Sequence, residues 1–254
     1  MNDISPESIL EWYVSAGVDE TIGDSPVNRF DVPAESDFPV PAAVPQRTFA
    51  PIRPAVGVAD TAPLADRAKS LAELREIIEK FDGCPLKKSA RSTVFGAGNP
   101  QARLMIVGEA PGAEEDRHGL PFVGASGHLL DKMLQSIGLK REDVYITNIL
   151  PWRPPANRKP SQEESALMTP FVRRHIALVQ PKVLLLLGGS AVSALMNIGD
   201  GIIKTRGRWL KYEHGGTVAD AMPSFHPAYL LRQPAQKKEA WRDLIEVRRK
   251  LASV

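Results

Sequence analysis

The sequence contains a single cysteine, Cys84, among its 254 residues. One thiol cannot form an internal disulfide, and it cannot by itself hold a structural zinc ion or an iron–sulfur cluster, because each of these needs several ligands. The sequence also lacks an apolar run of the roughly 20 residues that a membrane-spanning helix needs. Its first residues, MNDISPESIL, lack the basic and apolar segments of a secretory signal. We therefore expect a cytoplasmic protein with no membrane partner, stabilised by packing alone.

Basic side chains are scarce in the first 66 residues. The formal net charge of +2 therefore hides an uneven distribution of charge along the chain. Residues 1–66 carry 11 acidic and 3 basic side chains, whereas the remaining residues carry 29 basic and 19 acidic ones. A basic body suits a polyanionic partner such as DNA, since lysines and arginines that neutralise phosphates release condensed counterions. A solvated surface explains the same charges equally well.

The first 66 residues differ in composition from the rest of the chain. Residues 7–22 place apolar side chains close to helical spacing, which predicts a short amphipathic helix suited to docking on the body or on a protein partner. Eight prolines between Pro26 and Pro63 predict an extended, mobile linker, because proline opposes regular hydrogen-bonded structure. We expect the folded domain to span residues 67–254 and to act as a monomer.

Three short apolar runs in the body predict buried strands. They are RLMIVG at 103–108, VYITNIL at 144–150 and KVLLLLG at 182–188. Each run is followed by a loop and a helical pattern, which is typical of a parallel sheet covered on both faces. The helical patterns fall at 70–81, 125–138, 161–178, 190–198 and 235–250, and a weaker strand pair falls at 208–222. The sequence therefore predicts an α/β fold, a three-layer α/β/α sandwich with a central, mostly parallel, four-stranded sheet.

Polar side chains follow these strands at the points where each strand ends. Glu109 follows the first strand, Asn148 ends the second, and a basic loop at 153–160 comes directly after it. His226 follows the weaker strand pair, and Ser190 lies in a Gly-Gly-Ser turn at a helix start that offers backbone N–H groups to a phosphate. Because ligands of such folds bind beyond the carboxyl ends of the strands, we expect these residues to converge on one sheet edge.

Each of these features also has a purely structural explanation. A lone histidine such as His226 is more often a hydrogen-bonded core residue, and Phe122 after Pro121 is more often a hydrophobic anchor than a stacking platform. The basic loop can be a solvated turn. No G-x-x-x-x-G-K-[ST] or G-x-G-x-x-G motif follows the first strand, so nucleotide binding by those motifs is not expected. A functional site is favoured because all these residues are expected to converge on one edge of the sheet.

Three ordered segments of the chain resemble the family-four uracil-DNA glycosylases, the thermostable, iron–sulfur type of the uracil-DNA glycosylase superfamily. They are GEAPGAEEDRHGLPFVGASGHLL at 108–130, YITNILPWRPPANRKP at 145–160 and FHPAYLLRQPAQKKEAWRDL at 225–244. The resemblance covers roughly residues 67–250. It implies a nucleoid-associated, base-excision repair enzyme that flips uracil out of single- or double-stranded DNA and hydrolyses its N-glycosidic bond, leaving an abasic site. The alternative is a uracil-DNA or abasic-site binding module with poor turnover.

The same resemblance implies a role for each matching residue. Glu109 matches the carboxylate that positions or activates water, and His226 matches the histidine beside uracil O2. Phe122 matches the ring that stacks on the extruded uracil, and Asn148 matches the amide that pairs with its edge. Glu115 falls where the family has an acidic residue near uracil C5, which helps to exclude the methyl group of thymine.

The expected substrate pocket and DNA surface extend beyond these five residues. Ala110 and Gly112 complete the pocket. The stretch from Tyr229 to Arg232 matches the loop that inserts into the duplex, with Leu230 or Leu231 as the wedge. The residues expected to contact DNA are Arg153, Arg158, Ser190, Leu230, Leu231 and Arg232.

The sequence departs from the family at the cluster. The family normally holds a [4Fe-4S] cluster on four cysteines, and the aligned positions here are Phe81, Cys84, Trp152 and Met168. Since thiolates are the expected ligands, we expect no cluster, no other metal, and an apolar plug in its place. X-type relatives bond covalently to the sugar through a loop histidine. The corresponding loop, Pro154 to Pro160, contains no histidine, so we expect water to complete the reaction.

Overall fold

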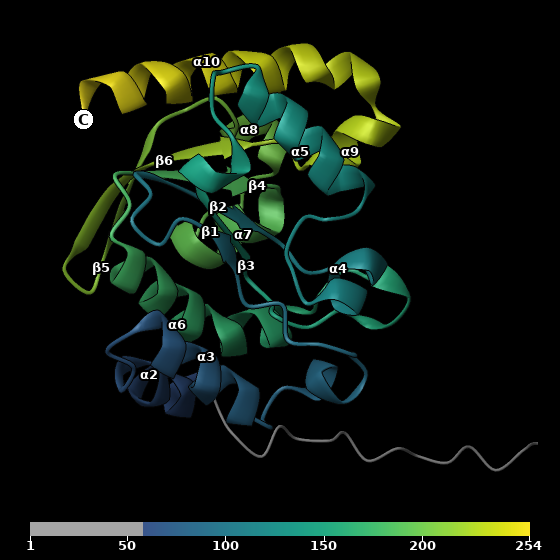
Figure 1. Ribbon diagram of the computed structural model, residues 1–254, viewed down its shortest axis with the longest axis vertical. Helices are drawn as coiled ribbons and strands as arrows, with labels where there is room; N and C mark the ends of the chain where they lie inside the picture. The colour runs from purple at the N-terminus through teal and green to yellow at the C-terminus, as the bar shows by residue number, and fades with distance from the viewer. Residues whose placement is uncertain (1–57) are drawn as a thin grey trace, which may run out of the picture. The chain divides into compact units, whose positions relative to one another are not determined.

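A mixed sheet of six strands lies at the centre of the computed structural model, which describes residues 58–254 (Figure 1). The strand order is β1-β3-β2-β4-β6-β5. The strands are β1 (Ala97–Gly98), β2 (Leu104–Gly108), β3 (Tyr145–Asn148), β4 (Val183–Leu187), β5 (Leu210–His214) and β6 (Thr217–Ser224). The four central strands are parallel, and β1 and β5 add an antiparallel strand at each edge. The expected four-stranded sheet is therefore the parallel centre of a six-stranded one.

The central strands consist of continuous apolar runs, so both faces of the sheet can be buried under helices. Every residue of β2 and β4 is buried. Successive side chains of a strand point to opposite faces. Accordingly, Met105 and Val107 belong to one buried cluster and Leu104 and Ile106 to the other. The core thus consists of two layers that are separated by the sheet.

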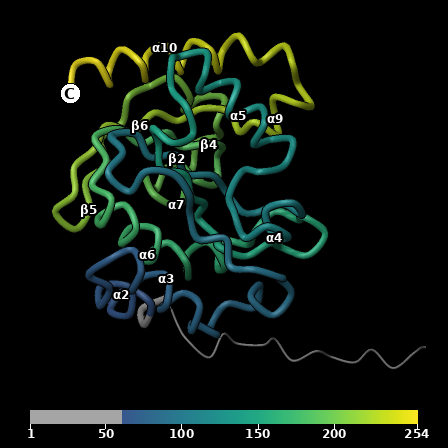
Figure 2. The backbone as a smooth tube through the Cα atoms, in the orientation of Figure 1, coloured from purple at the N-terminus to yellow at the C-terminus, as the bar shows by residue number. Residues whose placement is uncertain are grey.

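Helices cover both faces of the sheet, as Figures 1 and 2 show. The cluster on one face takes residues from α2 (Val58–Asp66), α3 (Leu71–Lys80), α6 (Gln162–Val179) and α7 (Gly189–Met196). The cluster on the other face takes residues from α5 (Ala125–Gln135), α9 (Pro227–Arg232) and α10 (Lys237–Ser253). Two shorter helices are α4 (Ala113–His118) and α8 (Ile202–Thr205). The three-layer α/β/α sandwich predicted from the apolar runs is confirmed.

Within residues 58–254 the connections contain four 3₁₀ segments and several capped helix starts. The 3₁₀ segments are η1 (Pro85–Lys88), η2 (Arg141–Asp143), η3 (Pro155–Asn157) and η4 (Pro234–Gln236). Helix α6 begins with a capping box, in which the Ser161 hydroxyl accepts the Glu164 N–H at 3.0 Å and the Glu164 carboxylate accepts the Ser161 N–H at 2.8 Å. This cap fixes the end of the basic loop that enters α6.

The folded body begins before the expected start at residue 67. Helix α2 covers Val58–Asp66 and contains Pro63, which the sequence places in the linker. Thr61 and Ala65 of this helix are buried. Proline has no backbone N–H, and its ring fixes φ at about −65°, a value that a helix tolerates. One proline therefore weakens a short helix but does not prevent one that packing stabilises. The predicted helix at 7–22 and most of the predicted linker lie outside the described residues.

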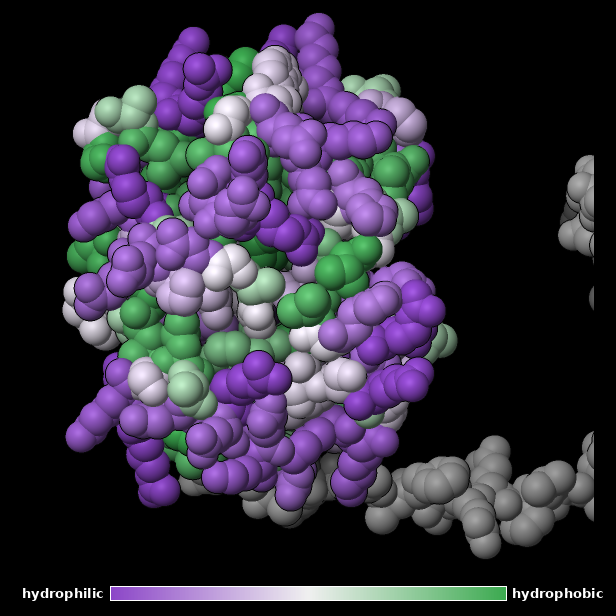
Figure 3. Space-filling model, viewed as in Figure 1, coloured by the Kyte–Doolittle hydropathy of each residue, from purple (hydrophilic) through white to green (hydrophobic). Residues whose placement is uncertain are grey.

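The visible face of the molecule in Figure 3 is mostly hydrophilic, with smaller hydrophobic areas between the polar side chains. No helix within residues 58–254 is both long and apolar enough to cross a membrane. Two buried clusters form the apolar core, whereas a few large apolar side chains, such as Ile203 and Trp241, are exposed.

Candidate functional site

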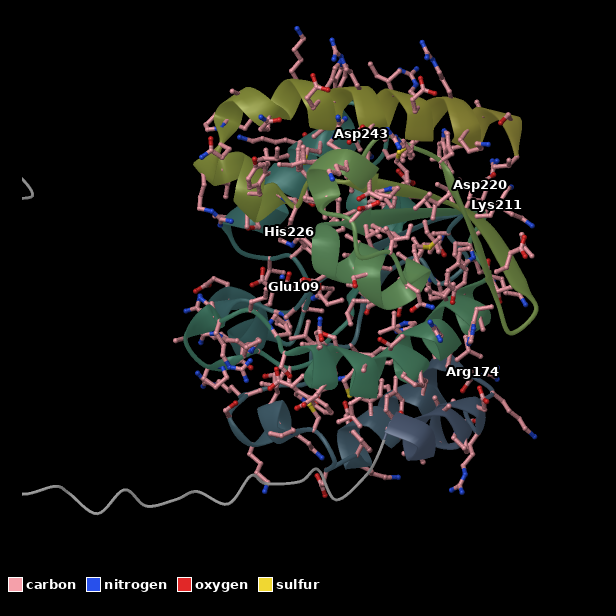
Figure 4. The ribbon with its side chains drawn as sticks, turned by 180° about the vertical axis from the view of Figure 1, so that it is seen from behind. Glu109, Arg174, Lys211, Asp220, His226 and Asp243 are labelled. Carbon is pink, nitrogen blue, oxygen red and sulfur yellow. The ribbon has the colours of Figure 1, made fainter. Side chains whose placement is uncertain are left out.

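A cavity of about 530 Å³ lies at the carboxyl ends of the parallel strands. Loops that follow β2, β3 and β6 line it, as expected for this class of sheet. The residues proposed from the sequence that line the cavity are Glu109, Ala110, Gly112, Glu115, Phe122, Asn148, Arg158, His226 and Arg232. Figure 4 shows Glu109 and His226 near one another on the same side of the molecule. The structure thus brings the expected acid, amide, ring and imidazole around one hollow.

Asn148 is the last residue of β3 and is 4% exposed. Its amide oxygen Oδ1 is buried without a hydrogen-bond partner among the described residues. The neighbouring Gly108 leaves room for it, because a Cβ there would lie 2.4 Å from Oδ1. A buried acceptor without a partner costs roughly 1–3 kcal/mol. The amide is therefore arranged to receive an N–H from a molecule in the cavity.

Phe122 forms a flat wall of the cavity. Its ring centroid lies 5.5 Å from that of His226, with 32° between the ring planes. The residue is buried and has a φ of 53°, in the left-handed region that bulky residues rarely adopt. Gly108 lies against the ring, since a Cβ there would be 2.7 Å from Cζ of Phe122. The ring thus offers a face to a planar group that enters the cavity beside His226.

His226 caps the start of α9 and is held as a neutral hydrogen-bond donor. Its Nδ1 accepts the N–H of Ala228 at 3.1 Å, which places the proton of the neutral ring on Nε2. Burial lowers the pKa of His226 to about 4, with a further lowering from the nearby Arg232 cation. At neutral pH the imidazole therefore offers Nε2–H without carrying a charge.

Glu109 follows β2 and is half-buried. Its Oε2 accepts a hydrogen bond from the Ser190 hydroxyl at 2.6 Å. Ser190 lies in the first turn of α7, so this helix start orients the carboxylate. From the sequence, Ser190 is expected to contact DNA. The structure instead pairs it with Glu109, because the ends of β2 and β4 are neighbours in the sheet.

Glu115 lines the cavity but also holds its rim together. Oε1 accepts the N–H groups of Val123 and Gly124 at 2.9 and 2.8 Å, and Oε2 accepts the N–H of Gly112 at 3.0 Å. Three backbone donors compensate this buried carboxylate and tie the residues after Phe122 to the start of α4. The family resemblance implies only a role near uracil C5 for Glu115, and this second role becomes visible in the structure.

The two candidate wedge residues lie in different environments. Leu230 is 1% exposed and packs in the core, whereas Leu231 is 44% exposed. Leu230 therefore lies in the core and Leu231 on the surface, because successive residues of helix α9 face different directions. Arg232 is also exposed, and it lines the cavity.

The two arginines of the basic loop also differ. Arg158 forms a two-pronged ion pair with Glu164, at 2.9 and 2.6 Å, and this pair lowers the pKa of Glu164. The charge of Arg158 is thus paired within the protein, and its side chain is 46% exposed beside the cavity. Arg153 donates from Nε to the side-chain oxygen of Asn157 at 2.7 Å, which leaves its other donors for an external group.

Some residues of the site were missed by sequence reasoning. Lys159, Tyr229 and Ser126 line the cavity. All three lie inside segments that resemble the glycosylase family, so their positions could have been included. Arg141 supports the cavity from behind, and its sequence neighbourhood carries no motif that indicates this.

The four aligned cluster positions form part of one buried hydrophobic cluster. Phe81, Cys84, Trp152 and Met168 are all at most 5% exposed. The Phe81 ring packs on Phe171 with centroids 5.2 Å apart. Within residues 58–254 no group of three or more His, Cys, Asp or Glu side chains could hold a metal ion.

These side chains do not fit an iron–sulfur cluster. A cluster needs several thiolates, and this position offers one thiol. Burial raises the pKa of the Cys84 thiol, which disfavours the thiolate form that binds iron. Phenylalanine and tryptophan carry no donor atom suited to iron.

Comparison with known proteins agrees with the geometry of the cavity. The family model of the uracil DNA glycosylase superfamily matches residues 95–245, a range that includes every loop around the cavity. The type-4 uracil-DNA glycosylase of Pyrobaculum aerophilum is 38% identical over 178 residues, which cover 68% of this chain and 91% of the relative.

Two further relatives show the same degree of similarity. The type-4 uracil-DNA glycosylase of Thermotoga maritima is 41% identical over 170 residues, 65% of this chain and 85% of the relative. That of Archaeoglobus fulgidus is 39% identical over 175 residues, 67% of this chain and 88% of the relative. The chain therefore belongs to the uracil DNA glycosylase superfamily, and within it to the type-4 uracil-DNA glycosylases.

Proposed function

We propose that this protein removes uracil from DNA by hydrolysing the N-glycosidic bond, and that it does so without an iron–sulfur cluster. The observation that carries the proposal is the buried, unpartnered Oδ1 of Asn148 in a cavity that also holds a neutral histidine and an aromatic wall. Base-excision repair requires this reaction, and an abasic site is its product.

Recognition of uracil follows from the donors and acceptors in the cavity. A base inside a duplex cannot reach the cavity, so the nucleotide must be extruded from the stack. The Asn148 amide accepts the uracil N3–H on Oδ1 and donates to O4, and Phe122 stacks on the ring. Cytosine presents the opposite polarity at this edge. It would leave buried polar groups unpaired, which discriminates strongly against it.

His226 stabilises the leaving group. As the C1′–N1 bond breaks, both bonding electrons leave with uracil, and negative charge develops on N1 and O2. A neutral Nε2–H donor beside O2 stabilises this anion, and its geometry is set beforehand by the Ala228 N–H bond. A preorganised donor of this kind contributes about 3 kcal/mol to transition-state stabilisation. Because the pKa of His226 is about 4, the ring is neutral at neutral pH. A neutral imidazole donates a hydrogen bond from Nε2–H but does not give up this proton.

Glu109 acts on the sugar side of the same bond. Its carboxylate stabilises the positive charge on C1′ and orients a water molecule, whose oxygen binds C1′ while its proton passes to the carboxylate or to solvent. The Ser190 hydroxyl holds Oε2 in place for this purpose. The products are free uracil and an abasic sugar with a hydroxyl on C1′. The loop Pro154 to Pro160 has no histidine for a competing covalent bond.

The DNA strand is held by exposed side chains at the mouth of the cavity. Leu231 is the wedge that fills the place of the extruded base, and Arg232, Arg153 and Lys159 contact phosphates. Contacts of this type do not depend on base sequence, so we expect both single- and double-stranded substrates. The protein acts as a monomer on the cytoplasmic DNA.

The experiment is release of free uracil from an oligonucleotide with one labelled deoxyuridine, using metal-free protein. We expect release by the wild-type protein, strong slowing in Glu109→Gln and His226→Ala, and no stoichiometric iron in the native protein. Tight binding of uracil-DNA without release would favour the binding-module alternative. Stoichiometric iron with visible thiolate–iron absorbance would overturn the cluster-free proposal while leaving the glycosylase proposal standing.

A further inference from the structure

The backbone of Phe122 needs support that its own sequence does not provide. A φ of 53° lies in the left-handed region, where a residue with a bulky side chain persists only when the surrounding structure fixes it. If the loop relaxed to an ordinary conformation, the ring would turn away from His226. The neighbours of the Phe122 peptide units therefore control whether a flat wall exists.

Arg141 supplies this support on the carbonyl side. Its Nη1 donates to the Pro121 carbonyl oxygen at 3.0 Å, and its Nη2 donates to the Phe122 carbonyl oxygen. Its Nε donates to Asp131 at 3.0 Å, which orients the guanidinium group. The planar guanidinium presents these donors in a fixed fork, so two successive carbonyl groups are held in a set relation.

The other side of the Phe122 loop is equally constrained. Helix α5 approaches closely because residue 127 is glycine, and a Cβ there would lie 1.8 Å from the Phe122 carbonyl oxygen. Glu115 accepts the N–H groups of the two residues that follow Phe122. Arg141 is not one of the residues that line the cavity, so its contacts with Phe122 are its connection to the site.

We infer that Arg141 is a positioning residue that sets the Phe122 ring for stacking on the extruded uracil. The inference rests on the proposed function, since it takes uracil as the group on which Phe122 stacks. Asp131 assists by holding the guanidinium and balancing its charge. A displacement of about 1 Å in a positioned group can cost about 100-fold in rate, although the displaced group takes no part in the chemistry.

The test is a double-mutant cycle between Arg141→Met and Phe122→Ala, read as single-turnover uracil release. Methionine keeps most of the length of the arginine side chain and removes all its donors. The matched control is Arg174→Met. Arg174 also donates to a backbone carbonyl, that of Ala68, and lies far from Glu109 and His226 in Figure 4.

We expect Arg141→Met to slow release about 10- to 100-fold and to weaken inhibition by free uracil, with less than about a twofold further effect in the Phe122→Ala background. Arg174→Met should leave release within about twofold of wild type. Equal slowing by Arg141→Met in both backgrounds, or release unchanged from wild type, would overturn the inference. If Arg141→Met does not fold, Asp131→Asn replaces it in the same cycle with a smaller expected slowing.

A second measurement separates this inference from the proposed function. If the wild-type protein releases no uracil, the proposed function fails, and calorimetric titration with free uracil then tests the inference on the same variants. Weakened uracil binding in Arg141→Met, absent in Arg174→Met and lost in the Phe122→Ala background, supports it. Absence of uracil binding by the wild-type protein, or equal binding by all variants, overturns it.

Discussion

The cavity and the buried cluster at the aligned cluster positions differ in how their side chains are satisfied. In the cavity, Asn148 keeps an unpartnered oxygen and Phe122 keeps an uncommon backbone angle. In the plug, by which we mean Phe81, Cys84, Trp152 and Met168, the side chains are packed within one hydrophobic cluster. The features of the cavity lower the stability of the fold and favour binding, whereas the side chains of the plug stabilise the fold and take no part in the chemistry. Substitutions in the two regions should therefore affect different measurements.

The largest expected effect is on stability, in the plug. Phe81→Ala should lower the free energy of unfolding by about 3–5 kcal/mol, because it leaves a void beside Phe171. Uracil release per folded molecule should stay close to wild type. The matched control is Trp241→Ala, since this aromatic side chain is 42% exposed and should cost about 1 kcal/mol or less. Denaturant titration measures both, and equal losses would contradict the packing of the plug.

The next effect is on activity, in the cavity. His226→Ala should slow uracil release about 100- to 1,000-fold, because the donor beside uracil O2 is lost. The control is His214→Ala, since His214 pairs with Thr217 at the amino end of β6, opposite the cavity. Single-turnover assays at saturating enzyme measure both. The comparison fails if the two alanine variants are slowed alike.

Asn148→Ala should slow release by about 5- to 150-fold, which corresponds to roughly 1–3 kcal/mol for the lost pairing with uracil. Its free energy of unfolding should stay the same or rise, because the substitution removes a buried oxygen that has no partner. Thermal or denaturant unfolding checks this. A large loss of stability would show that the amide serves the fold and not a ligand.

The pH profile sharpens the comparison further. The pKa of His226, about 4, lies below the ordinary histidine value of about 6.5. Release should therefore stay level from pH 8 to about 5 and fall towards pH 4, where a protonated Nδ1 can no longer accept the Ala228 N–H. Between about pH 6.5 and 4, His226 is protonated in the unfolded chain but not in the folded one. The free energy of unfolding therefore falls as the pH is lowered through this range, by up to about 1.4 kcal/mol per pH unit. A loss of activity centred near pH 6.5 would contradict this.

The smallest expected effect separates the two arginines of the basic loop. Arg153→Gln should lower the slope of log affinity for DNA against log salt by about 1, because one phosphate contact is lost. Arg158→Gln should change the slope less, since its charge is already paired with Glu164. It should instead lower stability by leaving that carboxylate without its partner. Equal slopes for both variants would remove the distinction between the arginines.

Much of the fold could be predicted because it depends on local pattern. The apolar runs of β2, β3 and β4 and the helical periodicity of α6 and α10 are visible in the sequence and appear where expected. Strand β1 could not be predicted, because two residues carry no periodicity. Helix α2 was missed because its packing against the body outweighs the proline-rich composition around Pro63.

The sequence could predict which residues belong to the candidate site, but not which contacts they form. The order of polar residues after strands and the family resemblance place Glu109, Asn148 and His226 at one edge. The pairing of Ser190 with Glu109 depends on which strands are neighbours, and the sequence does not show strand order. The support of Phe122 by Arg141 links segments that are 19 residues apart and share no motif.

The central claim is that uracil hydrolysis survives in a member of this family whose cluster position has become an apolar plug. The most direct measurement is the rate of uracil release by purified protein before and after exhaustive treatment with an iron chelator, with iron content determined on the same samples. The account predicts turnover at the same rate in both samples and iron well below one atom per chain. Loss of release on chelation, restored by iron and sulfide, would contradict it.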